Sequence, residues 1–470
     1  MEEVSRYEQS SREELIRVIV DQQQTLISQQ QTIVELSQTI VELKKEIQEL
    51  KHPVRKDSTN SSIPTSKEQI PRTRSQRKKS GKKVGGQPGH QGHRRERNAA
   101  PDNTLRIEAS HCESCGADLS EVEGTVGQMA QEVDIPPIRP ITTEYQQIIK
   151  VCSCGHCNAV ALPMEAEVSI GPQMSALITY LNVEHSLPYG RLTQISEDVL
   201  GFALSEGTVA NKLEHMLARA KGIIQRIKEQ VIAAKWTGSD ETSTRVAGKK
   251  FWQWVWQCPQ ASYYVVDPRR GYGVVQEHFT QNYQGVLIHD CWSAQNNTPA
   301  GAHQHCHAHL VRNLQYAIDK ERSVFAYRVQ RLLLKSQRAR DAIWQEEVTA
   351  ESRQAVIRFY QDEFAKLLAM PVTQKEERRL QKRLIKHQDW IFTFMSYPDV
   401  PPDNNSSERA IKAIKLKDKV SAGFRSKPGA SRFAGLLSLT QTLRKQHLPI
   451  LACLKAVFCG QDLPLFSPSG

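Results

Sequence analysis

The sequence contains no run of apolar residues long enough to cross a membrane, and its first residues, MEEVSRYEQSSREEL, lack both a basic start and an apolar stretch. We therefore expect neither a membrane anchor nor a signal peptide, and no membrane partner. Without export, the ten cysteines are not expected to form a disulfide framework. Five of them fall within residues 112–157, where metal ligation is the better interpretation.

Glycine is absent between Ala302 and Ala422, and stretches such as RVQRLLLKSQRARDAIWQEEV have strong helix propensity. This predicts an all-helical segment over residues 301–400. The HQHCHAH run near its start could bind zinc, but neighbouring ligands on so short a stretch cannot all reach one ion. We therefore favour a structural or DNA-facing role for its members, which are His303, His305, Cys306, His307 and His309.

The net charge of +11 is concentrated in one segment. Residues 51–97 contain fourteen Lys or Arg against three acidic residues, so this stretch alone carries the whole excess. Such a cationic segment binds polyanions by releasing counterions, although a solvated linker would have a similar composition. Residues 53–105 are thus predicted to be a largely disordered arm that binds nucleic acid, with phosphate contacts from Lys78, Lys79, Lys82, Lys83, Arg94 and Arg95.

Residues 1–52 carry heptads. The sequence QTIVELS is followed directly by QTIVELK over residues 31–44. Isoleucine or leucine recurs at heptad position a (Ile19, Leu26, Ile33, Ile40, Ile47), and leucine fills the later d positions. This pattern is typical of a parallel coiled coil, and five heptads favour it over an amphipathic helix packed on its own domain. We expect a homodimer or higher oligomer.

Residues 106–165 contain two CxxC pairs, Cys112 with Cys115 and Cys154 with Cys157. Each pair has the spacing at which one turn presents two sulfurs to a tetrahedral Zn²⁺. Cys152 could replace Cys154 as a ligand. A redox role is the weaker alternative, because no thioredoxin-like βαβ pattern surrounds either pair.

Residues 166–230 are predicted to be helical. The stretch LTQISEDVLGFALSEGTVANKLEHML breaks at Gly201 and restarts at Ser205. Two helices about a glycine turn are typical of a DNA-binding helix-turn-helix, and a plain helical bundle fits the pattern equally well.

From residue 231 the periodicity changes to that of strands. We predict strands at 231–240, 251–257, 261–267 and 285–290, with a short helix at 273–279 before the last one. The short turns make the first three strands antiparallel. The crossover then lets the fourth strand lie beside and parallel to the first, in the first part of a catalytic domain over residues 231–300.

Asp240 and Asp290 close the first and fourth of these strands. Carboxylates at neighbouring strand ends can share two divalent cations, one activating the attacking oxygen and the other stabilising the leaving oxygen of a phosphodiester. Oxygen ligands suit Mg²⁺ or Mn²⁺. Glu241 should point to the opposite side, and Asp267 precedes Pro268 in a turn, so neither is predicted as a ligand.

Residues 401–415, PPDNNSSERAIKAIK, change from a polar turn to a helix. Asn405 is a good N-cap residue, and Glu408 stands at the spacing of a capping box. Glu408 is therefore either a helix cap or a carboxylate held for chemistry, and the local pattern favours the cap. Residues 401–450 are predicted to complete the catalytic domain, and residues 451–470 to form a C-terminal tail.

Several segments together resemble the insertion-sequence-66 family of DDE transposases. They are NSSIPTS (60–66), GGQPGHQGH (85–93), the two CxxC pairs, DET (240–242), HDCW (289–292), CHAHLVR (306–312) and DNNSSERAIKAIKL (403–416). The resemblance implies a multidomain α+β protein with a coiled coil, a zinc-binding module, a helical DNA-binding region and a ribonuclease-H-like catalytic domain interrupted by an all-helical insertion.

By this resemblance, Asp240, Asp290 and Glu408 form the metal-binding catalytic triad. The implied activity is Mg²⁺- or Mn²⁺-dependent cleavage at transposon ends, followed by strand transfer into target DNA. Arg409, Lys412 and Lys415 would hold phosphates, and Zn²⁺ would be structural. The location implied is the bacterial cytoplasm in association with the nucleoid, with element-encoded accessory proteins as candidate partners.

Two other functions stay open at this point. One is a zinc-containing, sequence-specific DNA-binding protein whose ribonuclease-H-like domain is catalytically inactive, which would not nick end-sequence DNA in the presence of metal. The other, a ribonuclease acting on hybrids, is disfavoured because it would not need the coiled coil, the zinc module and the basic arm together.

Overall fold

The computed structural model describes residues 21, 24–26, 28–33, 35–36, 38–40, 89–91, 95–136, 138–164 and 166–466. The described residues between 21 and 40 are helical, and the apolar heptad positions among them are exposed. The other parts of the predicted coiled coil and most of the basic arm lie outside the described residues, including Lys78, Lys79, Lys82, Lys83 and Arg94.

The chain divides into two compact units. The first, called the sheet unit below, includes residues 228–243 and 252–412. The second, called the helical unit, includes the described residues from 89 to 227 together with 244–251 and 413–466. Among the helices of these described parts, none has the length and apolar content needed to span a lipid bilayer.

The sheet unit is built on a five-stranded mixed sheet in the order β5-β4-β3-β6-β7. Strand β6 is parallel to β3 and to β7, whereas β4 and β5 are antiparallel. Helix α6 (Tyr272–His278) provides the crossover from β5 to β6. The strands are β3 (Trp236–Val246), β4 (Lys249–Gln257), β5 (Ser262–Asp267), β6 (Tyr283–His289) and β7 (Ala300–His305).

Four strands in the predicted order and the crossover helix are confirmed, but the first strand, predicted from residue 231, begins only at Trp236 because helix α5 (Glu206–Ala233) continues to Ala233. The hairpin of β3 and β4 turns at Ala247 and Gly248, both with positive φ, as a two-residue hairpin turn requires. The fifth strand, β7, was not predicted. Its sequence, AGAHQH, has neither alternation nor β-branched residues, and it forms a strand because β6 offers a paired edge.

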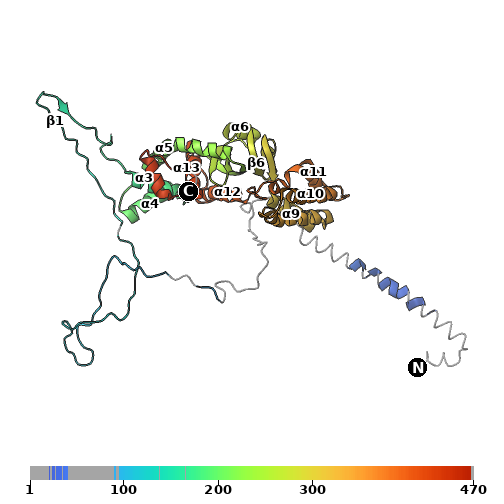
Figure 1. Ribbon diagram of the computed structural model, residues 1–470, viewed down its shortest axis with the longest axis horizontal. Coiled ribbons are helices and arrows are strands. Elements are labelled where there is room, and N and C mark those ends of the chain that lie inside the picture. Colours follow the sequence, from blue (N-terminus) through green and yellow to red (C-terminus); the bar gives the residue numbers. More distant parts are fainter. Residues whose placement is uncertain are drawn as a thin grey trace. The chain divides into compact units, whose positions relative to one another are not determined.

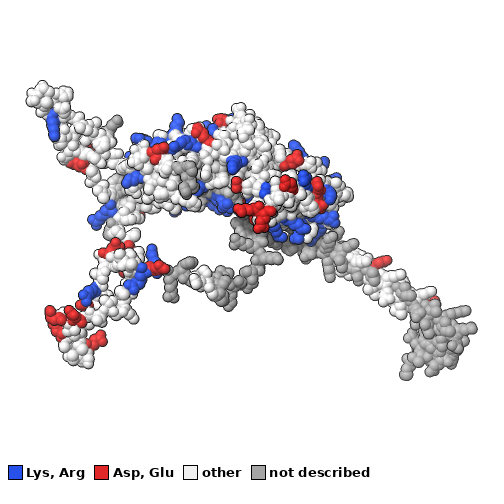
Figure 2. Space-filling model, in the orientation of Figure 1, with Lys and Arg blue, Asp and Glu red and all other residues white. Residues whose placement is uncertain are grey.

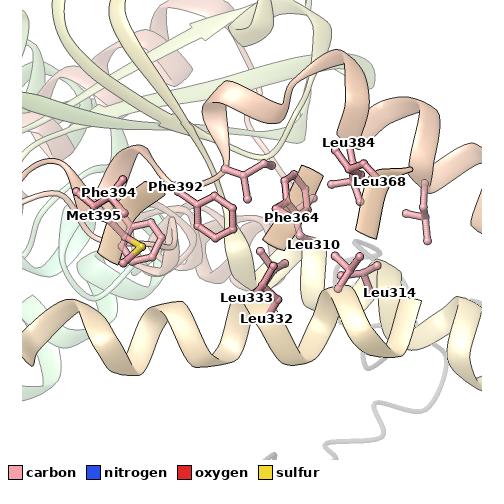
Figure 3. Packing of buried hydrophobic residues seen from close by; sticks show 14 of the residues in the cluster. Leu310, Leu314, Leu332, Leu333, Phe364, Leu368, Leu384, Phe392, Phe394 and Met395 are labelled. Atoms are coloured by element: carbon pink, nitrogen blue, oxygen red, sulfur yellow. The ribbon is translucent and has the colours of Figure 1, made fainter. Parts of the chain in front are cut away.

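The helices that follow β7 in the sequence pack against the sheet. Helix α8 packs against α9 and α11, and α9 packs against α10. Figure 1 shows α9, α10 and α11 side by side. Their apolar faces meet those of Trp236, Val286 and Ile288 in one buried cluster, and Figure 3 shows Leu310, Leu333, Phe364 and Leu384 turned into it. The helices are α7 (Ser293–Asn296), α8 (His307–Glu321), α9 (Val324–Ile343), α10 (Ala350–Leu368) and α11 (Lys375–Lys386).

Two short 3-10 turns, η2 (Gln388–Trp390) and η3 (Thr393–Met395), lead from α11 back across β7. Helix α12 (Asn405–Ser421) follows, and its residues up to 412 belong to the sheet unit. The predicted all-helical character of the segment before Glu408 therefore holds from residue 307 onward, after β7 ends.

The helical unit contains α3 (Pro172–Val183), α4 (Tyr189–Leu200), most of α5 (Glu206–Ala233), α13 (Lys427–Lys445) and α14 (Ile450–Phe458). Helix α14 packs against α3 and α13, so residues 451–470, predicted to be a tail, include a packed helix. The predicted break at Gly201 is confirmed, because Gly201 caps α4 in the left-handed conformation with φ +62°. Helix α5 begins at Glu206, next to the predicted restart at Ser205, and is 28 residues long.

The described residues from 95 to 166 have little regular structure. They contain one two-stranded hairpin of β1 (Lys150–Val151) and β2 (Cys157–Asn158), and an isolated bridge between His111 and Asp118. Large apolar side chains such as Ile107 and Ile141 are more than nine-tenths exposed. The segment therefore has no hydrophobic core of its own among the residues described.

Candidate active site

Strands β3 and β6 bring two aspartates to the same level. Their parallel pairing places Gly238 opposite Ile288, and the same register carried on by two residues sets Asp240 level with Asp290, directly after β6. The prediction that Asp240 ends its strand was wrong, because β3 continues to Val246 as the hairpin partner of β4. The parallel pairing of β3 with β6, however, extends only to Gly238.

The backbone of β3 at Gly238 lies very close to the start of α12, and this contact brings the third carboxylate, that of Glu408, near the edge of the sheet. A Cβ on Gly238 would lie 2.4 Å from Ser407 Oγ and 2.5 Å from Asn404 Oδ1. These two side chains are hydrogen-bonded to each other, and Asn404 Nδ2 donates to the carbonyl of Ser239 at 2.8 Å. Only glycine leaves room for this contact, which anchors the first turn of α12 and its Glu408 against β3.

Glu408 does not close a capping box. The backbone N–H of Asn405 donates to Asp403 Oδ1, and the carbonyl of Asn404 accepts the N–H groups of Ser407 and Glu408. The capping interpretation of Glu408 is therefore contradicted. Its carboxylate faces α8 instead, where Oε1 accepts a hydrogen bond from Arg312 Nη2 at 2.9 Å.

His309 and Cys306 flank the same carboxylate. His309 Nδ1 lies 3.4 Å from Glu408 Oε1, without the geometry of a hydrogen bond. One ligand atom each from Cys306, His309 and Glu408 falls within 4.8 Å of the others. The Cys306 thiol is also the acceptor for the N–H of Asn404, and burial raises its pKa to about 12. This thiol is thus a neutral packing group that holds the start of α12.

The negative charges of three other carboxylates act on Asp240. Burial, followed by the negative charges of Asp290 and Glu241 and more weakly that of Glu408, raises the pKa of Asp240 well above its usual range. The hydrogen bond from the N–H of Glu241 opposes the shift only in part. An excess of negative charge in a desolvated position is what a divalent cation neutralises.

Glu241 lies beside this group and its charge acts on Asp240, so the prediction that it points to the opposite side is not supported. Its side chain is 1% exposed, and its carboxylate accepts hydrogen bonds from Arg270 and Gln295, each at 2.7 Å. The guanidinium of Arg270 in turn lies between two indole rings, 4.3 Å from the centre of Trp252 and 3.6 Å from that of Trp292. Glu241 is thus occupied in a buried ion pair beside the two aspartates.

Asp267, the other acidic residue set aside on sequence grounds, ends β5. Its ligand atom, with those of Glu277 and His278, also forms a group within 4.8 Å. The guanidinium of Arg269 forms ion pairs with both Asp267 and Glu277, and so neutralises this group. Burial favours a higher pKa for Asp267, but the hydrogen bonds from Arg269 and His278 outweigh it and lower the pKa to about 2.

The histidines of the HQHCHAH run face different surroundings. His303 stacks on Trp390 with ring centres 4.3 Å apart, and His305 lies edge-on to the same ring. His307 contacts the carbonyl of Ile391 at 2.7 Å, and burial lowers its pKa to about 4. Only His309 reaches the acidic group, so the run is divided between core packing and the site.

The basic residues after Glu408 differ in exposure. Arg409 and Lys412 are exposed, and Lys415 is partly buried near Asp418, at 3.8 Å. Lys417, which follows on the same helix, is buried over the ring of Phe433, and burial lowers its pKa to about 8. Figure 2 shows basic side chains spread over the folded part of the chain with acidic ones among them.

The five clustered cysteines are free and mostly exposed. Hydrogen bonds from the backbone N–H groups of Cys115 and Ser114, and then from the Cys115 thiol, lower the pKa of Cys112. Hydrogen bonds from the backbone N–H and the thiol of Cys154 likewise lower the pKa of Cys152. In the turn between β1 and β2, the neighbouring thiols are therefore Cys152 and Cys154. Among the described residues of this segment, no three ligand atoms come within 4.8 Å of one another.

Three site residues were missed by the sequence analysis, namely Arg270, Gln295 and Arg312. Arg312 ends the CHAHLVR segment, which was a usable signal once that segment was noted. Arg270 and Gln295 follow strands β5 and β6 at no diagnostic spacing, and only the folded sheet brings them together at Glu241.

Comparison with known families gives two matches. The family described as "Transposase IS66 family" matches residues 167–432, which span both units and include all three candidate carboxylates. A family of unknown function, DUF6444, matches residues 8–96. No curated protein matches the chain.

Proposed function

The chain belongs to the IS66 family of transposases, and on this basis we propose that it cleaves DNA at the ends of its insertion sequence and joins the freed ends to target DNA. The ribonuclease-H-like interpretation is supported by the strand order, three antiparallel strands followed by two parallel ones. The placement of Asp240, Asp290 and Glu408 at one edge of the sheet carries the proposal: it is supported by the parallel register of β3 and β6 and by the contact of Asn404 and Ser407 with β3 at the start of α12.

These residues fit a divalent metal centre. The three carboxylates offer oxygen ligands only, as Mg²⁺ and Mn²⁺ prefer, and their negative charges are incompletely balanced inside the protein. Bound there, such ions would polarise the scissile phosphodiester and lower the pKa of the attacking hydroxyl group or water. We assign Asp240, Asp290 and Glu408 as the metal-holding catalytic residues.

The other residues of the site have supporting roles. Arg312 fixes the orientation of the Glu408 carboxylate through its hydrogen bond, and His309 packs beside it. Arg270 neutralises Glu241, so that this fourth carboxylate adds less repulsion to the aspartates. Gly238 and Asn404 hold α12 at the distance at which Glu408 reaches the site.

The N-terminal modules complete the proposal. We propose that Cys112, Cys115, Cys154 and Cys157 hold a structural Zn²⁺, with Cys152 as the alternative to Cys154. Residues 53–105, with Arg409, Lys412 and Lys415, contact DNA phosphates. The heptads of residues 1–52 join two chains, because transposition requires two ends to be held together.

The test is metal-dependent nicking. Purified protein is incubated with labelled duplexes carrying the ends of the element and with Mn²⁺, Mg²⁺ or EDTA. Strand-specific cleavage that requires the metal and is lost in Asp290→Asn supports the proposal. Tight binding of the ends without any cleavage would instead favour a DNA-binding protein with an inactive catalytic domain.

A further inference from the structure

Helix α9 carries a row of exposed basic side chains along one face. The row consists of Arg328, Arg331, Lys335 and Arg338, which are all exposed. At 3.6 residues per turn, these four positions fall within an arc of about 80° on the helix surface. With a rise of about 1.5 Å per residue, the row is about 15 Å long. It is called the basic row below.

The protein does not neutralise the basic row. Among the described residues, the side chains of Arg331, Lys335 and Arg338 have no hydrogen bond, ion pair or ring contact, and Arg328 has a contact only to the sulfur of Met370, at 3.9 Å. Like charges three or four positions apart on a helix repel one another. The row therefore forms a patch of positive potential that a polyanion would relieve.

The helices that pack against α9 have balanced charge. Helix α9 has five Lys or Arg against one acidic residue, whereas α8 has two against two and α10 three against three. On α10, Lys366 pairs with Glu363 at 2.7 Å, as is common on a solvated helix surface. The remaining arginine of α9, Arg340, donates to the carbonyl of Pro398 and pairs with Asp341. The basic row thus differs from an ordinary solvated face.

The inner face of α9 is anchored to α8, the helix that carries Arg312. Gln330 Nε2 donates to the carbonyl of Val311 at 3.2 Å, and Leu333 turns into the buried cluster (Figure 3). Arg312 in turn donates to Glu408 Oε1 at 2.9 Å. The basic row is therefore exposed to solvent on a helix whose position relative to the acidic site is fixed by printed contacts within one unit.

We propose that the basic row binds phosphates of the duplex next to the acidic site, so that the helical segment between β7 and α12 forms part of the DNA-binding surface. The proposal rests on the proposed function, because it takes DNA as the substrate. Duplex DNA carries one negative charge per about 1.7 Å of its axis, so a row about 15 Å long can meet several phosphates. Because all four side chains are exposed, phosphate oxygens can reach them directly.

The row should act on DNA binding more than on the chemical step. It lies on α9, whereas Arg312 and its contact to Glu408 lie on α8, and the axes of packed helices are about 8–10 Å apart. The phosphates that the row contacts are therefore those flanking the cleaved bond. Such contacts position the duplex and carry no sequence information of their own.

The test compares three variants. Arg331→Gln/Lys335→Gln/Arg338→Gln removes three charges of the row, and Arg331→Lys/Lys335→Arg/Arg338→Lys keeps them. Arg358→Gln/Lys366→Gln removes two exposed charges of α10 as the control for location. Affinity for a labelled duplex carrying the end of the element is measured in EDTA between about 50 and 200 mM salt. Cleavage is measured with Mn²⁺ against DNA concentration, and thermal unfolding reports on folding.

For the variant without the three charges, the slope of log affinity against log salt should fall by about 2.7, since each phosphate contact contributes about 0.9. The affinity advantage of the wild type should therefore shrink about 40-fold from 50 to 200 mM salt. Cleavage at limiting DNA should slow with the lost affinity, and excess DNA should restore most of it. The charge-keeping variant and the α10 variant should retain the wild-type slope.

A wild-type slope in the variant without the three charges would overturn the proposal, and so would an equal fall per charge in the α10 variant. A loss of affinity without a change in slope would also overturn it, because it would indicate contacts other than phosphates. If the triple variant does not fold, Lys335→Gln alone decides, with an expected fall of about 0.9. If the wild type fails to nick but the slope still falls, the proposed function fails while the phosphate contact stands.

Discussion

Replacing Gly238 with alanine tests how the site is assembled. The added Cβ would stand 2.4 Å from Ser407 Oγ and 2.5 Å from Asn404 Oδ1, and 2.9 Å from Gln257 Nε2. Ordinary contact requires roughly 3.4 Å or more, so the start of α12 must move by about 1 Å. Both oxygens belong to fully buried, mutually hydrogen-bonded side chains, which cannot simply turn away.

The expected cost combines two effects. Overpacking of a filled interior costs about 1–3 kcal/mol, and the loss of one buried hydrogen bond adds about 1–2 kcal/mol. The free energy of unfolding of the sheet unit should therefore fall by about 2–5 kcal/mol. Glu408 would move with α12, and a displacement of about 1 Å at a reacting centre can slow catalysis about 100-fold.

Gly273→Ala is the matched control. Gly273 belongs to α6 in the same unit, and no atom lies within 4 Å of the position of its added Cβ. Its stability should stay within about 0.5 kcal/mol of the wild type. Denaturant unfolding and nicking of end DNA are measured on both variants. A Gly238→Ala protein with wild-type stability and cleavage would refute the tight approach of α12 to β3.

Three further predictions concern the remaining features. Asp240→Asn should raise the melting temperature measured at pH 7 in EDTA. The same variant should show no cleavage of end DNA in Mn²⁺. The pKa of Asp240 is raised in the folded protein, so the wild-type protein loses stability as pH rises from the unfolded-state pKa of about 4 through the higher folded-state pKa. An amide does not ionise and therefore removes this loss. An unchanged or lower melting temperature would contradict the prediction. Metal analysis should find about one tightly bound zinc per chain, and unchanged zinc in Cys112→Ser/Cys115→Ser would rule out that ligand set. A chain lacking residues 1–52 should lose self-association but still bind single ends, and light scattering that shows the same oligomer would refute the coiled coil.

The sequence predicted the sheet well because its strands alternate and its turns are short. The parallel neighbours β3 and β6, and hence the level positions of Asp240 and Asp290 just beyond their paired residues, followed from strand order alone. Strand β7 could not be predicted, because AGAHQH has no strand propensity and depends on the edge of β6. For the candidate site, the sequence analysis named the acidic residues but not the arginines that pair with them.

The cations of the site lay outside sequence reasoning for a physical reason. Arg270 and Arg312 come from two distant segments, and only Arg312 belongs to a motif that the sequence analysis noted. Their roles depend on which carboxylate each meets after folding. The capping alternative for Glu408 was likewise settled only by the backbone hydrogen bonds of Asn404 and Asn405.

The most direct test of the proposed catalytic centre is the cleavage rate of Glu408→Gln on end DNA in Mn²⁺. Glutamine keeps the size of the side chain and can still accept the hydrogen bond from Arg312, so folding and end binding should persist. The lost negative charge should prevent the residue from holding a metal ion, and cleavage should fall to background. Asp403→Asn, in the same turn but outside the triad, should retain most activity. Wild-type cleavage by a folded Glu408→Gln protein would contradict the account and place the third metal ligand elsewhere.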